Sequence, residues 1–186
     1  MTDVFVPPVV DCVRLRLRPV RPEDATYIYG LRMNPDYNRH LSEVTGTVAD
    51  QRAWIERYKA REAQGQEIYY IIERLGDGVP CGTVRLYDIA ADSFTWGSWI
   101  LDENKTPKAA LESAVLVYVV AFDRLGCSRA LFDVRRDNSR TLDFHRRFGA
   151  RETRYDDLNV YFEYPRAHFE ADQDGYISIL KLEAET

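Results

Sequence analysis

The residues with the clearest potential for chemistry lie where the apolar run WGSWIL (96–101) ends and an alanine-rich segment begins. Thr106 is a suitable N-cap for a helix, and Pro107 suits the first helical position. The first amides of such a helix have no partner within it, so they can bind an anion together with the helix dipole. Lys105 and Lys108 flank this position and add positive charge. The segment is therefore either a phosphate-binding helix start or an ordinary capped helix, and the local signals alone favour the latter.

A second candidate is the stretch DVRRDNSRTLDFHRRFGARET (133–153), the most basic part of an acidic chain. Asn138 and Ser139 are residues that begin helices by capping, and Phe144 and Phe148 would form the apolar face of this helix. The arginines of the stretch form either a solvated face or a clamp for a polyphosphate. Two helices that each follow a strand, one with an anion site and one with arginines, suit a cofactor with a nucleotide tail.

Composition limits the classes of protein that the chain can belong to. The chain has 186 residues, of which 45% are hydrophobic and 30% charged, so we expect one globular domain with a loose extension at residues 1–10. A net charge of −5 gives no reason to expect binding to nucleic acid or to a membrane surface. There is no leader-like start, and the apolar run 114–122 is too short to span a bilayer, so we expect a cytoplasmic protein. Three separate cysteines favour neither a disulfide framework nor a metal site.

Apolar periodicity and turn residues predict the elements that must position these candidates. Strands are predicted at 12–17, 67–74, 81–89, 93–101, 129–135, 158–164 and 176–182. Helices are predicted from Arg21–Asp24 to before Asn34, from Thr47 onward by a capping box with Asp50, over 107–125, and over 138–148. The segment VLVYVV (115–120) also fits a strand, but its alanine-rich entry and FDRLG exit favour a helix. The order of elements predicts an α/β (α+β) fold, a mixed sheet flanked by helices, with an antiparallel meander from 67 to 101.

From Val13 to Leu182 the sequence resembles the GNAT superfamily of acyl-CoA-dependent N-acyltransferases, in particular ribosomal-protein-type and amino-sugar N-acetyltransferases. The resemblance lies in RLRLRPVRPEDATYIYGLRMNPDYNRHL (14–41), GTVRLYDI (82–89), WGSWIL (96–101) and NSRTLDFHRRFGA (138–150). The last stretch is similar to the family's Asn-x-x-Ser/Ala-x-x-x-Tyr-x-x-x-Gly pattern, with Asn138, Thr141, His145 and Gly149 at the corresponding places. The resemblance implies a single GNAT-like domain over residues 1–186, with a mostly antiparallel central sheet and a splayed central strand pair.

The resemblance also implies acetyl-CoA as co-substrate and no metal. It places the pantetheine arm along the main chain of 99–101 and the pyrophosphate in the loop 105–110. The residues that we expect to contact the cofactor are Trp99, Ile100, Leu101, Lys105, Thr106, Pro107, Lys108, Ala109, Ala110, Asn138 and Arg140. The family's loop reads Gln/Arg-x-x-Gly-x-Gly/Ala, whereas KTPKAA keeps only Ala110, and bulkier residues such as Lys108 fill the glycine positions. His145 stands where the family usually has a tyrosine that protonates the leaving thiolate.

Acyl transfer to an amine also needs a general base and a pocket for the acceptor. Candidate bases are Asp88, Glu163 and His168, although for each carboxylate a structural role is the commoner one. Candidate walls of the acceptor pocket are Tyr37, Tyr87 and Tyr164. No acidic base is evident beside Trp96, where some relatives have one.

Three functions remain open from the sequence. The first is acetyl transfer to a primary amine of an amino sugar, either free or linked to a nucleotide. The second is acetylation of a protein N-terminus, so the acceptor is a small-molecule or a peptide amine. The third is a GNAT-fold module that binds without catalysis, which the missing glycines motivate. Dimers are common among relatives, so the resemblance allows a homodimer, but no residue here indicates an interface.

Overall fold

The central strand β3 (Ile68–Arg74) shows how the chain builds its interior in this computed structural model, which describes residues 3–185. The strand is apolar at consecutive positions instead of alternating, because the sheet is covered on both faces. Ile68, Tyr70 and Ile72 point into the main core. Tyr69 and Ile71 point into a second, smaller core on the other face. The sheet is therefore the middle layer of three.

The sheet has eight strands in the order β1-β2-β3-β4-β5-β6-β8-β7. Besides β3, these are β1 (Val10–Asp11), β2 (Leu15–Pro19), β4 (Pro80–Tyr87), β5 (Ser93–Leu101), β6 (Arg129–Arg135), β7 (Arg151–Tyr155) and β8 (Asn159–Pro165). All neighbours are antiparallel except β5 and β6, which are parallel. The predicted α/β fold with a mostly antiparallel sheet is confirmed, as is the meander, which comprises β3, β4 and β5.

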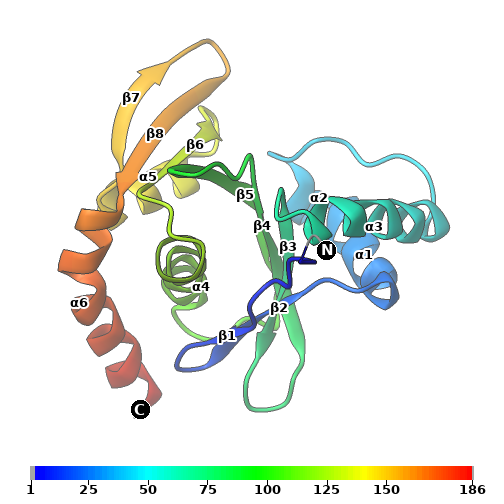
Figure 1. Ribbon diagram of the computed structural model, residues 1–186, viewed down its shortest axis with the longest axis horizontal. Coiled ribbons are helices and arrows are strands. Elements are labelled where there is room, and N and C mark those ends of the chain that lie inside the picture. Colours follow the sequence, from blue (N-terminus) through cyan, green and yellow to red (C-terminus); the bar gives the residue numbers. More distant parts are fainter. Residues whose placement is uncertain (1–2, 186) are drawn as a thin grey trace.

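One face of the sheet is covered by the helices that follow β2 (Figure 1). They are a short 3₁₀ turn, η1 (Pro22–Asp24), and the helices α1 (Ala25–Met33), α2 (Pro35–Asn38) and α3 (Val48–Ala63). The predicted capping box is present at the start of α3: the Thr47 hydroxyl accepts from the Asp50 amide, and the Asp50 carboxylate accepts from the Thr47 amide. Ile55 and Tyr58 of α3 pack with Ile28 of α1 in the smaller core.

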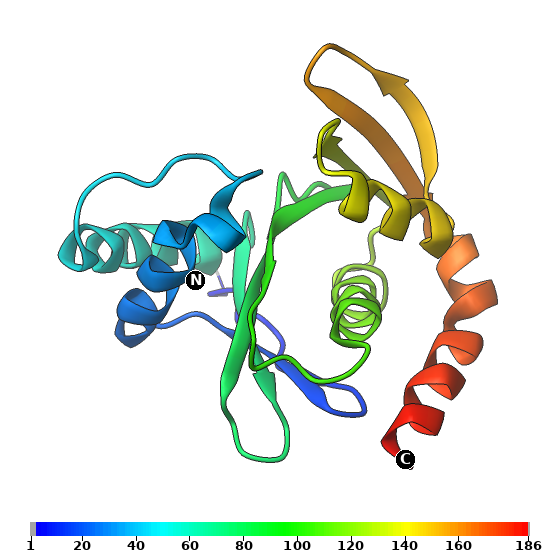
Figure 2. The same ribbon diagram turned by 180° about the vertical axis from the view of Figure 1, so that it is seen from behind.

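The opposite face carries α4 (Ala109–Tyr118), which continues as a π-helical segment η2 (Val119–Arg124), with α6 (Arg166–Ala184) beyond it (Figure 2). The predicted helix in this region is confirmed over the alternative strand. It is buried nearly all round, since the sheet lies on one side and α6 on the other. Glu112 lies inside this buried helix, and its Oε1 accepts hydrogen bonds from the amides of Arg14 (2.6 Å) and Leu15 (2.9 Å). That contact fixes α4 against the start of β2.

Two predictions about the C-terminal third were wrong. Residues 176–182, predicted as a strand, lie in α6, where Phe169, Tyr176 and Leu180 pack at helical spacing. The alternating pattern of YISILKL imitates a strand because the helix buries only part of its surface. The strand β7 (RETRY) was not predicted, because all its residues are exposed and mostly charged, so it has no apolar signal. It is an edge strand that pairs only with β8.

The N-terminal segment is held to α3 and β3 by two hydrogen bonds. We expected a loose extension at residues 1–10; residues 1–2 lie outside the described part, and residues 3–9 form no helix or strand. The amide of Phe5 donates to the carbonyl of Ala63 (3.0 Å), and the hydroxyl of Tyr70 donates to the carbonyl of Pro8 (2.8 Å). Within residues 3–185, no helix combines the length and the apolar character that a bilayer span requires.

Candidate active site

The site begins where β5 and β6 separate. These two parallel strands pair only through Ser93 with Arg129 and Phe94 with Ala130, and from Trp96 onward β5 diverges from β6. The main chain of β5 from Trp96 to Leu101 therefore pairs with β4 on one side only. This is the splayed strand pair that the resemblance implied. It leaves backbone amides and carbonyls of β5 facing the opening between the strands.

A β-bulge at Ser98 shapes the middle of β5. Gly97 pairs with Arg85 and Ile100 pairs with Thr83, so β5 holds one more residue than β4 between these two pairs. Ser98 has a left-handed backbone (φ +48°), and its carbonyl accepts a hydrogen bond from the Thr83 hydroxyl (3.2 Å). A left-handed conformation costs energy for a residue with a side chain and is typical of functional sites. The bulge places Ser98 in the walls of two pockets.

The first of these, which we call the inner pocket, has a volume of about 240 Å³ and lies between β5, β6 and α5 (Ser139–Phe148). It brings together five residues predicted from the sequence: Tyr37, Tyr87, Trp99, Asn138 and His145. Asn138 also caps α5, because its side-chain oxygen accepts from the Thr141 amide (3.3 Å). The predicted start and end of α5, at Asn138 and Gly149, are confirmed.

His145 forms part of the inner wall of this pocket, and only 4% of its surface is exposed to solvent. Its ring lies 4.4 Å from that of Phe132, 5.3 Å from Trp96 and 5.4 Å from Phe144, centroid to centroid. Burial among these rings lowers the pKa of His145 to about 3. The imidazole is therefore neutral at neutral pH. It lacks the charged acid form that protonation of a thiolate would normally use, and only a neutral N–H remains as donor.

The other predicted catalytic and acceptor residues lie away from the inner pocket. Asp88 is exposed in the turn after β4, with a left-handed backbone (φ +48°). Glu163 on β8 pairs with Arg151 (2.9 Å) and with Arg129 (3.6 Å). Tyr164 is fully buried in the main core, with its ring 4.6 Å from that of Tyr118. His168 is exposed on α6. Tyr164 therefore cannot wall a pocket, and Glu163 has the structural role that is commoner for such carboxylates.

The structure adds two titratable residues that the sequence reasoning missed. His40, which follows α2, lines the inner pocket, and its Nδ1 lies 3.2 Å from Oδ1 of Asp137. Asp133 on β6 also lines the pocket; partial loss of water raises the pKa of its carboxyl. Two signals were available: His40 lies in the stretch NRHL (38–41), and Asp133 interrupts the apolar strand RALFDVR. Neither signal has a spacing that links it to α5.

The loop between β5 and α4 differs from its prediction in where the helix starts and in how that start is capped. The helix begins at Ala109, not Pro107, and Thr106 makes no side-chain cap. Thr106 instead closes a turn, since its carbonyl accepts from the Ala109 amide (3.2 Å). The reason is Lys108, the residue before the helix, whose left-handed backbone (φ +59°) cannot belong to the helix. Lys108 thus has the backbone shape that favours glycine, at a position where the family pattern has glycine.

This loop still offers donors for an anion. The amides of Ala110 and Leu111 belong to the first turn of α4, so they have no acceptor within the helix. Lys105 and Lys108 are exposed beside them. Arg140, the other basic residue predicted to contact the cofactor, is exposed on α5. The arrangement is that of an anion-binding helix start with two lysines.

Two buried contacts hold the loop in place. Asp102, which is 5% exposed, accepts from the Tyr27 hydroxyl (2.7 Å) and from the Asn104 amide (2.8 Å). On the other side, the indole N–H of Trp99 donates to the Ser113 hydroxyl (3.1 Å), which joins β5 to α4. The loop between β5 and α4 is therefore fixed relative to the splayed strand.

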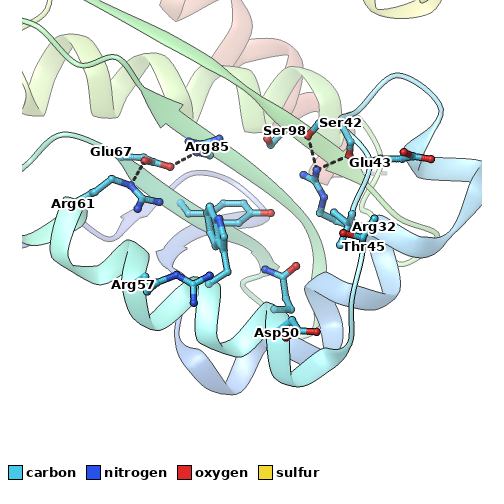
Figure 3. A pocket seen from close by; sticks show the side chains of 14 residues that line it. Arg32, Ser42, Glu43, Thr45, Asp50, Arg57, Arg61, Glu67, Arg85 and Ser98 are labelled. Atoms are coloured by element: carbon cyan, nitrogen blue, oxygen red, sulfur yellow. Dashed lines mark hydrogen bonds and ion pairs between the residues drawn. The ribbon is translucent and has the colours of Figure 1, made fainter.

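The second pocket, which we call the outer pocket, has a volume of about 670 Å³ and lies on the α3 side of the sheet (Figure 3). Its charged lining residues are Arg32, Glu43, Asp50, Arg57, Arg61, Glu67 and Arg85. Trp54 and Tyr69 add aromatic surface. Ser42 and Ser98 line both pockets, so the two adjoin. Within residues 3–185, no group of three His, Cys, Asp or Glu side chains is arranged to hold a metal ion.

Comparison with known proteins places this geometry in context. The sequence profile of the acetyltransferase (GNAT) domain matches residues 14–151. The solved structure of apo FdhC, described as a nucleotide-linked sugar GNAT, is 41% identical, with a TM-score of 0.86 over 92% of this chain and 97% of that one. A GCN5-related N-acetyltransferase from Brucella melitensis is 17% identical (TM-score 0.77, covering 93% and 85%). Spermidine N-acetyltransferase from Vibrio cholerae, solved with CoA and spermine, is 15% identical (TM-score 0.72, covering 84% and 98%). A search of curated proteins found no match.

Proposed function

Because the chain belongs to the GNAT acetyltransferase family, we propose that it transfers the acetyl group of acetyl-CoA to the primary amine of an amino sugar, including one linked to a nucleotide. The observation that carries the proposal is the position of the inner pocket, which lies in the opening between β5 and β6 and adjoins a larger outer pocket. The likeness to a nucleotide-linked sugar GNAT at 41% identity supports the choice of acceptor.

The residues present fit acetyl-CoA. The left-handed backbone at Lys108 and the first-turn amides of Ala110 and Leu111 provide a site for its pyrophosphate. The unpaired side of β5 along 99–101 provides main-chain groups for the pantetheine arm, and Asn138 lies on the other side of the opening. When bound, acetyl-CoA supplies the thioester carbonyl that an amine attacks. An amide of the splayed strand can polarise that carbonyl.

A primary amine is mostly protonated at neutral pH, so it must lose a proton before it attacks. We assign this step to His40, which lines the inner pocket and has Asp137 beside its Nδ1. Oδ1 of Asp137 lies 3.2 Å from Nδ1 without a hydrogen bond between them, so a small rotation of either side chain would form the carboxylate–imidazole pair used by histidine bases. Asp133 is the alternative base in the same pocket. Neither Asp88 nor Glu163 lines it.

His145 keeps a role in this proposal, but not as a charged acid. Its pKa of about 3 means that the imidazole is neutral, so an N–H of the neutral ring is the group it would offer to the leaving sulfur. A neutral donor can hydrogen-bond to a developing thiolate. The thiolate then receives a proton either from solvent or from His40, which took one from the amine. This differs from the family's usual tyrosine, which donates from a hydroxyl.

Two other acceptor classes fit less well. A polyamine would meet four arginines in the outer pocket, and like charges disfavour its binding. A protein N-terminus is the second candidate, because the inner pocket suits any small primary amine. With a net charge of −5, however, the chain has no basic surplus for association with ribosomes.

A thiol-release assay with acetyl-CoA tests the proposal. The acceptors would be a nucleotide-linked amino sugar, the free amino sugar, spermidine and a short peptide with a free N-terminus. We expect CoA release with the amino sugars and background rates with spermidine. The peptide as best acceptor would instead establish the protein-acetylating function. Tight binding of acetyl-CoA without turnover on any amine would establish a binding module.

A further inference from the structure

The outer pocket is larger than an amino sugar requires. Its volume of about 670 Å³ falls within the range of about 300–1,000 Å³ typical of small-molecule sites, whereas the inner pocket, at about 240 Å³, falls below it. Ser42 and Ser98 line both, so one ligand can occupy the two together. From its lining we infer that the outer pocket binds the nucleoside diphosphate part of the acceptor while the sugar amine lies in the inner pocket. This inference rests on the proposed function.

The charge of the outer pocket favours a phosphate ligand. Four arginines line it, against the carboxylates of Glu43, Asp50 and Glu67. Glu67 is buried and already bound to Arg61 (2.8 Å) and to Arg85. Asp50 is held by the capping box of α3. Two of the three negative charges are therefore committed to contacts within the protein, and the arginine N–H groups exceed the acceptors available to them.

Arg57 is the arginine best placed to bind a ligand. It projects from α3 toward the pocket, opposite the loop that carries Ser42 and Thr45 (Figure 3). Within the described residues it makes no hydrogen bond or ion pair. Arg32 lies on the other side, where its Nη2 donates to the carbonyl (2.9 Å) and hydroxyl (3.0 Å) of Ser42. Planar guanidinium groups on both sides suit the oxygens of a diphosphate.

The aromatic residues of the outer pocket provide a surface for a base. Trp54 is half-buried and stacks on Tyr58 with parallel rings 5.7 Å apart. The guanidinium carbons of Arg61 and Arg85 lie 5.5 Å and 5.9 Å from the Trp54 ring. Indole and guanidinium planes are the groups on which bases stack. A nucleoside diphosphate therefore matches the pocket better than a free phosphate, which would leave the aromatic surface unused.

Calorimetric titration of nucleoside diphosphates tests the inference directly. Uridine and thymidine diphosphate would be titrated into the protein already saturated with CoA, so that the pyrophosphate site at Lys108 is occupied. We expect one binding site per chain, and at least about tenfold weaker binding of inorganic pyrophosphate, which has no base. Absence of binding by every nucleoside diphosphate, or pyrophosphate binding as tightly as they do, would overturn the inference.

Variants on α3 locate the site. Arg57→Gln removes an exposed side chain without a partner, so the fold is not expected to change, and binding of the diphosphate should weaken about tenfold or more. Arg52→Gln on the same helix, whose arginine pairs with Glu56 (3.2 Å) and does not line the pocket, is the matched control and should bind normally. Equal affinity of the two variants would place the ligand elsewhere. CoA binding should be the same in both.

Binding and activity measurements on the wild type and on Arg57→Gln test this inference and the proposed function separately. If nucleoside diphosphates bind as expected but no amino sugar is acetylated, the pocket assignment stands and the proposed reaction is wrong. If amino sugars are acetylated but Arg57→Gln leaves the KM of the nucleotide-linked acceptor unchanged, the reaction stands and the pocket assignment is wrong.

Discussion

The Nδ1 atom of His40 lies 3.2 Å from Oδ1 of Asp137, so a residue that follows α2 meets one that precedes α5 beside the inner pocket. The two residues are almost a hundred positions apart in the sequence, and the fold brings their side chains together. The contact places a carboxylate beside the imidazole of His40, with no hydrogen bond to its Nδ1.

Replacing His40 tests its assignment as the base. His40→Gln should lower kcat by about 10²- to 10⁴-fold, the contribution typical of a positioned general base, with little change in the KM for acetyl-CoA. Asp137→Asn should lower kcat less, because it removes the negative charge beside the imidazole and leaves the base itself in place. Steady-state kinetics of thiol release measures both. His168→Gln, which changes an exposed histidine on α6, is the control; an unchanged kcat in His40→Gln would transfer the role to Asp133.

Because His145 is buried in its neutral form, we expect the folded protein to lose stability at acid pH. Its pKa is lowered to about 3 in the folded protein, against about 6.5 when unfolded, so between these values the unfolded chain binds the extra proton. Stability should therefore fall with decreasing pH by up to about 1.4 kcal/mol per pH unit within this window from this group alone. The effect disappears progressively above pH 6.5, where the imidazole of the unfolded chain also loses its proton.

Denaturant unfolding at pH 7, 5.5 and 4.5 measures this contribution. His145→Phe places another ring among Phe132, Phe144 and Trp96 and removes the titrating group. The variant should lose less stability than the wild type between pH 7 and 4.5. Parallel loss in the two proteins would mean that His145 is not buried in the neutral form.

The left-handed backbone at Lys108 predicts an unusual order of stability among substitutions. Lys108→Gly relieves the steric cost of a side chain at positive φ, whereas Lys108→Ala keeps it. We expect the glycine variant to be more stable than the alanine variant by about 1 kcal/mol, the reverse of the order in a regular helix. Chemical denaturation compares the two, and both lack the lysine charge. A more stable alanine variant would show that this residue is not left-handed.

The lack of a side chain at Gly82 allows β4 and β5 to lie close together. A Cβ at this position would lie 2.1 Å from the carbonyl oxygen of Ile100, which is backbone and cannot move alone. Gly82→Ala should therefore destabilise the protein by about 1–3 kcal/mol, as overpacking does, and should also weaken binding of CoA because it displaces β5. Gly76→Ala is the control, since its Cβ meets nothing within 4 Å. Thermal unfolding and CoA titration give the two readouts.

Much of the fold was accessible from the sequence because local signals agreed with tertiary structure. The capping box at Thr47, the cap at Asn138 and the stop at Gly149 each lie where predicted. The meander of β3 to β5 followed from short connections between apolar runs. The failures have local causes as well: β7 is charged and exposed, and α6 carries an alternating run that imitates a strand.

The site was predicted less completely, because its parts come from distant segments. Residues on α5 and β5 were found through a known pattern, but His40 and the arginines of the outer pocket come from α1, α3, β4 and the loop after α2. No spacing in the sequence connects them. The left-handed Lys108 was also beyond prediction, since lysine has no preference for that conformation and tertiary contacts such as those of Asp102 hold the loop.

The junction of β5 and β6 at Ser93 and Phe94 has a mechanical consequence. Five strands lie on one side of this junction and three on the other, so the two halves of the sheet can tilt about it while few main-chain hydrogen bonds change. The width of the gap is then set by side chains that bridge it, chiefly Trp96 of β5, whose ring lies 5.8 Å from that of Phe132 on β6, and the rings around His145. A molecule inserted between the halves would act as a wedge, and its departure would let the sheet close again.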